Sequence, residues 1–91
     1  MMNESARPKQ VADYHLEMLD GELILYHLDQ TKILYCNETA SVIWHLCDGR
    51  QTVGEIITLL SNAYPEAAAD IAPDVERTLE EFLAAGSIEL T

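Results

Sequence analysis

The stretch that decides the fold is Leu34–Ile56, LYCNETASVIWHLCDGRQTVGEI. It opens with the end of an apolar strand, and Asn37 is placed to cap the helix that follows. Gly49 ends this helix, because glycine is suited to the left-handed position beyond a helix C-terminus. Thr52 and Glu55 then form a capping box, in which side-chain oxygens satisfy unpaired amides at a helix start. This segment therefore predicts a strand, a helix and the start of a second helix.

Two apolar runs before this stretch predict a hairpin. They cover residues 14–19 and 22–28, with an Asp-Gly pair between them. Both positions of a tight hairpin turn need positive φ, which Asp-Gly adopts readily. Residues 29–32 make a second turn before the strand Ile33–Cys36. The sequence therefore predicts a three-stranded antiparallel sheet, which must be covered on one face to be stable.

The second half of the chain predicts helices. Apolar residues recur at helical spacing over residues 38–47, 53–64 and 70–85, and Pro65 and Gly86 end the last two segments. Strands followed by helices indicate an α+β domain. Because a short turn joins the last two helices, as in a helix-turn-helix, we expect a winged-helix-like domain with a three-stranded antiparallel sheet followed by three helices.

Composition limits the domain count and the partners. The 91 residues fit one domain, which we expect over residues 14–91 after a flexible tail at 1–13. The sequence lacks a long apolar run and the apolar core of a secretory signal, so we expect a cytoplasmic protein. Sixteen acidic residues against five basic ones give a net charge of −11. This charge predicts repulsion from nucleic acids and anionic membranes.

The candidate reactive groups do not form a catalytic or metal-binding motif. Cys36 and Cys47 lack the spacing of zinc or redox sites. The sequence alone allows a disulfide between them, but reduced thiols are expected in the cytoplasm. His45 and Cys47 do not converge on a helix, and His15 with His27 gives only two ligands. The chain also lacks a glycine-rich phosphate loop. We therefore expect no enzymatic activity, no metal and no cofactor.

The helix-turn-helix outline also raises the question of DNA binding. The helix after the turn would then enter the major groove. In this chain that helix holds Asp74, Glu76, Glu80 and Glu81 against a single cation, Arg77. Phosphates would repel such a helix, so we expect no nucleic-acid partner.

The order of these signals resembles the PqqD-like family, named after pyrroloquinoline quinone (PQQ) biosynthesis protein D and also called the RiPP recognition element. That family has an aliphatic strand, a Leu-Asn-like pair followed by Thr-Ala, an apolar helix, Asp-Gly and Thr-Val-x-Glu-Ile. Here the pair is Cys36-Asn37, and the resemblance extends from about Tyr14 to Leu90. It implies a non-catalytic peptide chaperone that binds the leader segment of a ribosomally synthesised precursor peptide as an added strand. The chaperone would present that peptide to a modifying enzyme, such as a radical SAM protein or a leader peptidase, in PQQ or other RiPP biosynthesis.

The peptide-binding residues follow from an exposed strand edge, which presents unpaired main-chain groups to an added strand. The third strand is the available edge, with Ile33, Leu34, Tyr35 and Cys36 as candidates. The resemblance places the opposite wall on the third helix, beside its buried stripe, with candidates Asp74, Arg77, Thr78 and Glu81 and a further one in Ala85. Two alternatives stay open: the chain's own tail or a second copy covers this edge, or the chain is a dimeric regulatory or protein-interaction module without a leader peptide.

Overall fold

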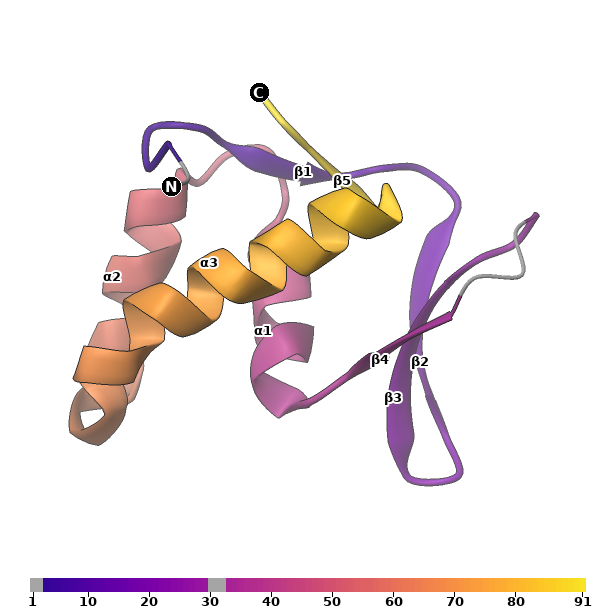
Figure 1. The fold of residues 1–91 in the computed structure, drawn as a ribbon, viewed down its shortest axis with the longest axis horizontal. Coiled ribbons are helices and arrows are strands. Elements are labelled where there is room, and N and C mark those ends of the chain that lie inside the picture. The colour runs from indigo at the N-terminus through magenta and orange to yellow at the C-terminus, as the bar shows by residue number, and fades with distance from the viewer. Residues whose placement is uncertain (1–2, 30–32) are drawn as a thin grey trace.

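A computed structural model describes residues 3–29 and 33–91 of the chain (Figure 1). One antiparallel sheet has the strand order β2-β3-β4, formed by β2 (Tyr14–Leu19), β3 (Glu22–His27) and β4 (Ile33–Cys36). The helices α1 (Glu38–Leu46), α2 (Val53–Ala63) and α3 (Ala68–Ala85) follow, with a 3-10 turn at Pro65–Ala67 before α3. The predicted α+β class, with a three-stranded antiparallel sheet followed by three helices, is confirmed.

The hairpin between β2 and β3 forms as its turn residues predict. Asp20 and Gly21 both have positive φ, at 52° and 82°. The register places Leu25 of β3 between Leu16 of β2 and Leu34 of β4, so all three side chains lie on one side of the sheet. The turn predicted over residues 29–32 falls mostly on residues 30–32, which lie outside the described residues.

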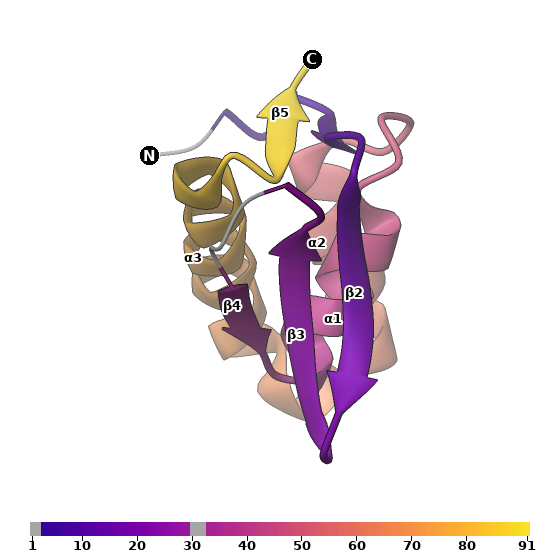
Figure 2. The same ribbon diagram turned by 90° about the vertical axis from the view of Figure 1, so that its right-hand side faces the viewer.

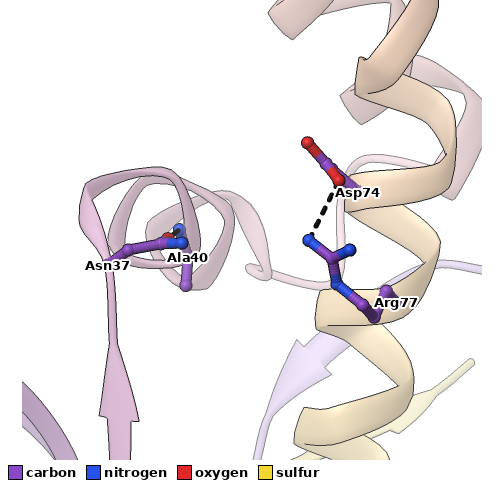
Figure 3. A network of polar contacts seen from close by, with 4 residues as sticks. All are labelled: Asn37, Ala40, Asp74 and Arg77. Carbon is purple, nitrogen blue, oxygen red and sulfur yellow. Dashed lines mark hydrogen bonds and ion pairs between the residues drawn. The ribbon is translucent and has the colours of Figure 1, made fainter.

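The helix starts also follow the sequence. Asn37 Oδ1 accepts a hydrogen bond from the Ala40 amide at 2.8 Å, which caps α1 (Figure 3). Thr52 and Glu55 form the predicted capping box at α2, and the hydrogen bond from the Thr52 amide lowers the pKa of Glu55. The helix α3 begins at Ala68, two residues before the expected start and without a side-chain cap. Local capping chemistry therefore fixes the starts of the two shorter helices.

The core lies between the helices and one face of the sheet (Figure 2). Trp44 packs edge-on against Phe82 with ring centroids 5.6 Å apart, as core packing predicts. Both cysteines are free, and burial with the nearby Asp48 charge raises the pKa of Cys47 to about 12. The buried apolar residues of this core cluster are Leu25, Ala40, Ile43, Trp44, Cys47, Val53, Ile56, Leu60, Ile71, Val75, Leu79, Phe82 and Ile88.

The N-terminal segment differs from the predicted flexible tail at 1–13. Residues Pro8–Gln10 form β1, which pairs antiparallel with β5 (Ile88–Leu90) at the C-terminus. The Val53 and Gly54 amides donate to main-chain carbonyls of residues 6 and 4, at 2.9 and 3.0 Å. The carbonyls of residues 4 and 6 thus satisfy the first amides of α2, a role that the polar composition of this segment does not reveal. In the described residues, no helix is both long and apolar enough to cross a membrane.

Candidate functional site

The strand β4 lies at one edge of the sheet, and within residues 3–29 and 33–91 it pairs with β3 alone. The helix α3 lies beyond this edge, and the two elements run in opposite directions (Figure 2). A strand edge of this kind presents main-chain N–H and C=O groups that can pair with another chain. We call the free edge of β4 and the facing residues of α3 the β4–α3 site.

The four predicted strand residues alternate across the sheet. Leu34 and Cys36 are half-buried and pack against the core, whereas Ile33 and Tyr35 are 52% and 69% exposed on the opposite face. The direction of each side chain follows from the two-residue period of a strand. The main chain of β4 is therefore held in place by its inner side chains, while its outer edge carries no partner strand among the described residues.

A small apolar hollow lies at the start of β4. It has a volume of about 70 Å³ and is lined by Tyr14, Leu25, Ile33, Leu34 and Ala85. These residues come from all three strands and from the last residue of α3. Since one water occupies about 30 Å³ of liquid, the hollow has room for a small aliphatic group only.

Tyr14 connects the sheet to the end of α3. Its hydroxyl donates a hydrogen bond to the Ala85 carbonyl at 2.9 Å. This bond sets the distance between the hollow's two sides and also satisfies a carbonyl in the last turn of α3. The role of Tyr14 could not be predicted from the sequence, because its partner lies 71 residues away along the chain. The one indication of its role in the sequence is that an aromatic residue stands at an inward-facing position of β2.

The Cys36 thiol, at the end of β4, is influenced by a carboxylate of α3. The pKa of the Cys36 thiol is raised by partial burial and, to a smaller extent, by the negative charge of Glu81. The Glu81 carboxylate therefore lies within electrostatic range of the Cys36 thiol. A raised pKa keeps the thiol protonated at neutral pH, so Cys36 is a poor nucleophile.

An ion pair lies further toward the start of α3. Arg77 and Asp74 bond to each other at 2.9 Å, with side chains 65% and 39% exposed (Figure 3). Asp74 is about two helical turns from Glu81. An exposed pair of this kind contributes little to stability, so both groups are free to exchange partners. The structure thus brings Ile33, Leu34 and Ala85 together and Cys36 near Glu81, but pairs Asp74 and Arg77 with each other.

Thr78 requires a correction. The residue was predicted to lie beside the buried stripe of α3, but it is only 9% exposed and belongs to the stripe. The inward face is centred between residues 78 and 79, so both are covered by the core. Thr78 is therefore a packing residue and not an accessible wall of the site.

The chemistry of the site is that of recognition. Among residues 3–29 and 33–91, no cluster of three or more His, Cys, Asp or Glu side chains could hold a metal. The site offers main-chain hydrogen bonds, an apolar hollow, a carboxylate and an exposed ion pair. The fold and the site together define a small α+β domain whose open strand edge faces a helix.

This chain belongs to the PqqD family. The sequence model of the family described as "Coenzyme PQQ synthesis protein D (PqqD)" matches residues 22–88, which include β4 and the whole of α3. A curated relative, the "PqqA binding protein" of Klebsiella pneumoniae (strain 342), is 38% identical over 64 residues. The aligned region covers 70% of this chain and 61% of the relative, so this chain spans less than two thirds of that protein. No solved structure matches the chain.

Proposed function

We propose that this protein is a non-catalytic peptide chaperone that binds the leader segment of a ribosomally synthesised precursor peptide. The peptide adds to β4 as a further strand and is presented to a modifying enzyme of the radical SAM or peptidase type. The observation that carries this proposal is the free edge of β4 beside α3, within the residues that match the PqqD family. The name of the Klebsiella relative, a PqqA binding protein, supports a PqqA-type peptide as the first ligand to test.

The layout of the β4–α3 site favours particular peptide residues. Main-chain bonds to β4 provide affinity that does not depend on sequence, and the side-chain positions set the register. The hollow lined by Ile33, Leu34 and Ala85 accepts a small aliphatic side chain. Glu81 attracts a basic residue further along the peptide, and Arg77 attracts an acidic one by exchanging its bond with Asp74.

The charge of the chain supports a peptide partner over a nucleic acid. The net charge is −11, and the exposed carboxylates of α3 include Glu80 and Glu81. A polyphosphate backbone would meet repulsion along this helix, whereas a leader peptide with one or two basic residues would be attracted. We therefore expect no binding of duplex DNA at about 0.15 M salt, where screening weakens the repulsion without removing it.

The direct test is a titration with the leader segment of a PqqA-type precursor, followed by hydrogen exchange of the main-chain amides. We expect saturable binding and slower exchange at β4, because its free-edge amides gain partners. A peptide of the same composition in scrambled order is the control. Absence of binding, or protection confined to β2 at the other edge of the sheet, would contradict the proposal.

A further inference from the structure

The sheet has a second surface, on the side turned away from the helices. Figure 2 shows this side of the sheet toward the viewer, with α1 and α2 behind it. The strand register places Glu17, Ile24 and Tyr35 in one row across the three strands. The next row consists of His15, Tyr26 and Ile33. We call these six residues the outer face.

The outer face is apolar at its centre. Ile24 is 9% exposed although it does not belong to the core cluster, so its neighbours on this face cover it. Tyr35 and Ile33 flank it and are among the most exposed large apolar side chains. Of the exposed large apolar side chains in the described residues, Ile33 and Tyr35 belong to the outer face, and Leu19 lies on the same side of β2, two residues after Glu17. Gathered apolar exposure of this kind marks an interaction surface more often than scattered single residues do.

The rim of the outer face is acidic. Between Asp13 and Asn37 the sequence has five carboxylates, namely Asp13, Glu17, Asp20, Glu22 and Asp29. The one cation in this span is Lys32, which lies outside the described residues. A surface with an apolar centre and an acidic rim is complementary to one with an apolar centre and a basic rim.

The same charges argue against a second copy of this chain as the occupant. Each copy has a net charge of −11, and a symmetric contact would bring the same carboxylates together. The size of the face also argues against a stable dimer. Each outward side chain takes up two strand residues, roughly 6.6 Å, and the strands lie about 4.8 Å apart, so six side chains give a face of only about 190 Å². A stable interface covers about 800 Å² on each partner.

We propose that the outer face is a docking surface for a second protein, whose contact surface has an apolar centre and a rim of lysine or arginine. Its small area fits a transient contact that forms and dissociates in each delivery. The face shares Ile33 with the hollow of the β4–α3 site, but Tyr35 points to the outer side while Leu34 and Cys36 point inward. A peptide strand and the protein partner therefore bind at the same time.

The test uses as the probe a radical SAM enzyme that modifies a PqqA-type precursor, a choice that rests on the proposed function. Glu17→Lys reverses one charge on the outer face, and Tyr26→Ala removes part of its apolar centre. Glu66→Lys, on the exposed 3-10 turn before α3, is the matched charge control. Affinity for the enzyme is measured at low and at physiological salt, and affinity for the leader peptide is measured separately with each variant.

We expect Glu17→Lys and Tyr26→Ala each to weaken enzyme binding at least tenfold, with a larger effect of Glu17→Lys at low salt. Glu66→Lys should change it less than twofold, and none of the three should change peptide affinity more than twofold. Melting curves test whether the Tyr26→Ala variant is folded. If that variant is unfolded, the result for Glu17→Lys alone tests the inference.

Three results would overturn the inference. In the first, both outer-face variants bind the enzyme as the parent does. In the second, the parent protein binds the peptide but not the enzyme. This result contradicts the docking surface and leaves the proposed peptide-binding function standing. In the third, sedimentation shows a dimer that Glu17→Lys or Tyr26→Ala dissociates, which makes this face a contact between copies. Failure of the parent to bind the peptide would instead contradict the proposed function.

Discussion

The sheet has two free edges, and they differ in what lies beside them. The strand β2 has six residues and offers more main chain than β4, which has four. Only β4 has the helix α3 alongside, with a hollow at one end and Glu81 near the other. Main-chain groups alone do not distinguish the two edges, so the neighbouring helix must provide selectivity. We therefore expect a peptide to choose the shorter edge.

The largest effect should come from loosening α3. Phe82 is 1% exposed and packs on Trp44, so Phe82→Ala should reduce the free energy of unfolding by about 3–5 kcal/mol through lost burial and a cavity. Urea unfolding measures this, with Leu59→Ala on the exposed side of α2 as the control. If the folded molecules of the Phe82→Ala variant bind the peptide as tightly as the parent does, then α3 is not the feature that distinguishes the β4 edge from the β2 edge.

Proline substitutions compare the two edges directly. Successive amides of a strand point to opposite sides, so one of Leu34→Pro and Tyr35→Pro removes a free-edge amide and the other removes a bond to β3. We expect the free-edge variant to lose about tenfold or more in peptide affinity. Leu16→Pro and Glu17→Pro are the matched pair on β2. Circular dichroism must show retained structure, and greater sensitivity at β2 would reverse the assignment.

A smaller effect is expected at the bond that joins the sheet to α3. Tyr14→Phe removes the donor to the Ala85 carbonyl and should cost about 1 kcal/mol of stability. Peptide affinity should fall a few-fold, because the hollow is no longer held at a fixed width. Tyr64→Phe at the end of α2 is the control, since that side chain is half exposed. Unchanged affinity with reduced stability would make Tyr14 purely structural.

The smallest effect concerns the thiol at the end of β4. The Glu81 charge contributes to the raised pKa of Cys36, so Glu81→Gln should lower this pKa and increase the thiolate fraction at a given pH. Alkylation of Cys36 at about pH 8 should then become faster by a factor of two or three. Cys47 should stay unreactive, since its pKa is about 12 and it is buried. An unchanged rate would mean that Glu81 does not face β4.

The parts of this molecule that could be predicted from sequence are those controlled by neighbouring residues. Asn37 caps α1, the Thr52–Glu55 box starts α2, and Asp20-Gly21 turns the hairpin, each through bonds or dihedral angles within a few positions. The free edge of β4 also followed, because the order of three consecutive strands leaves the third unpaired on one side.

The parts that could not be predicted depend on distant contacts. The inward face of α3 is centred between Thr78 and Leu79, and a periodicity pattern alone could not separate a buried threonine from an exposed one. The bond from Tyr14 to Ala85 joins residues at opposite ends of the chain. The pairing of Pro8–Gln10 with Ile88–Leu90 is made by main-chain groups. Almost any side chain is compatible with such pairing, except a proline in the middle of the strand, so the sequence does not reveal it.

That last pairing determines where the chain ends lie. Thr91 and Arg7 exchange main-chain hydrogen bonds at 3.0 Å, so the N-terminal segment passes beside the C-terminal residue (Figure 1). A short linker could close the two ends into a ring, and new ends could be opened at the exposed turn between Asp20 and Gly21 without breaking a buried element. The same arrangement lets this unit be inserted as a cassette into a loop of a larger protein. Both connections to that host would then leave from the β1–β5 pair, and the free edge of β4 would stay uncovered by the connections.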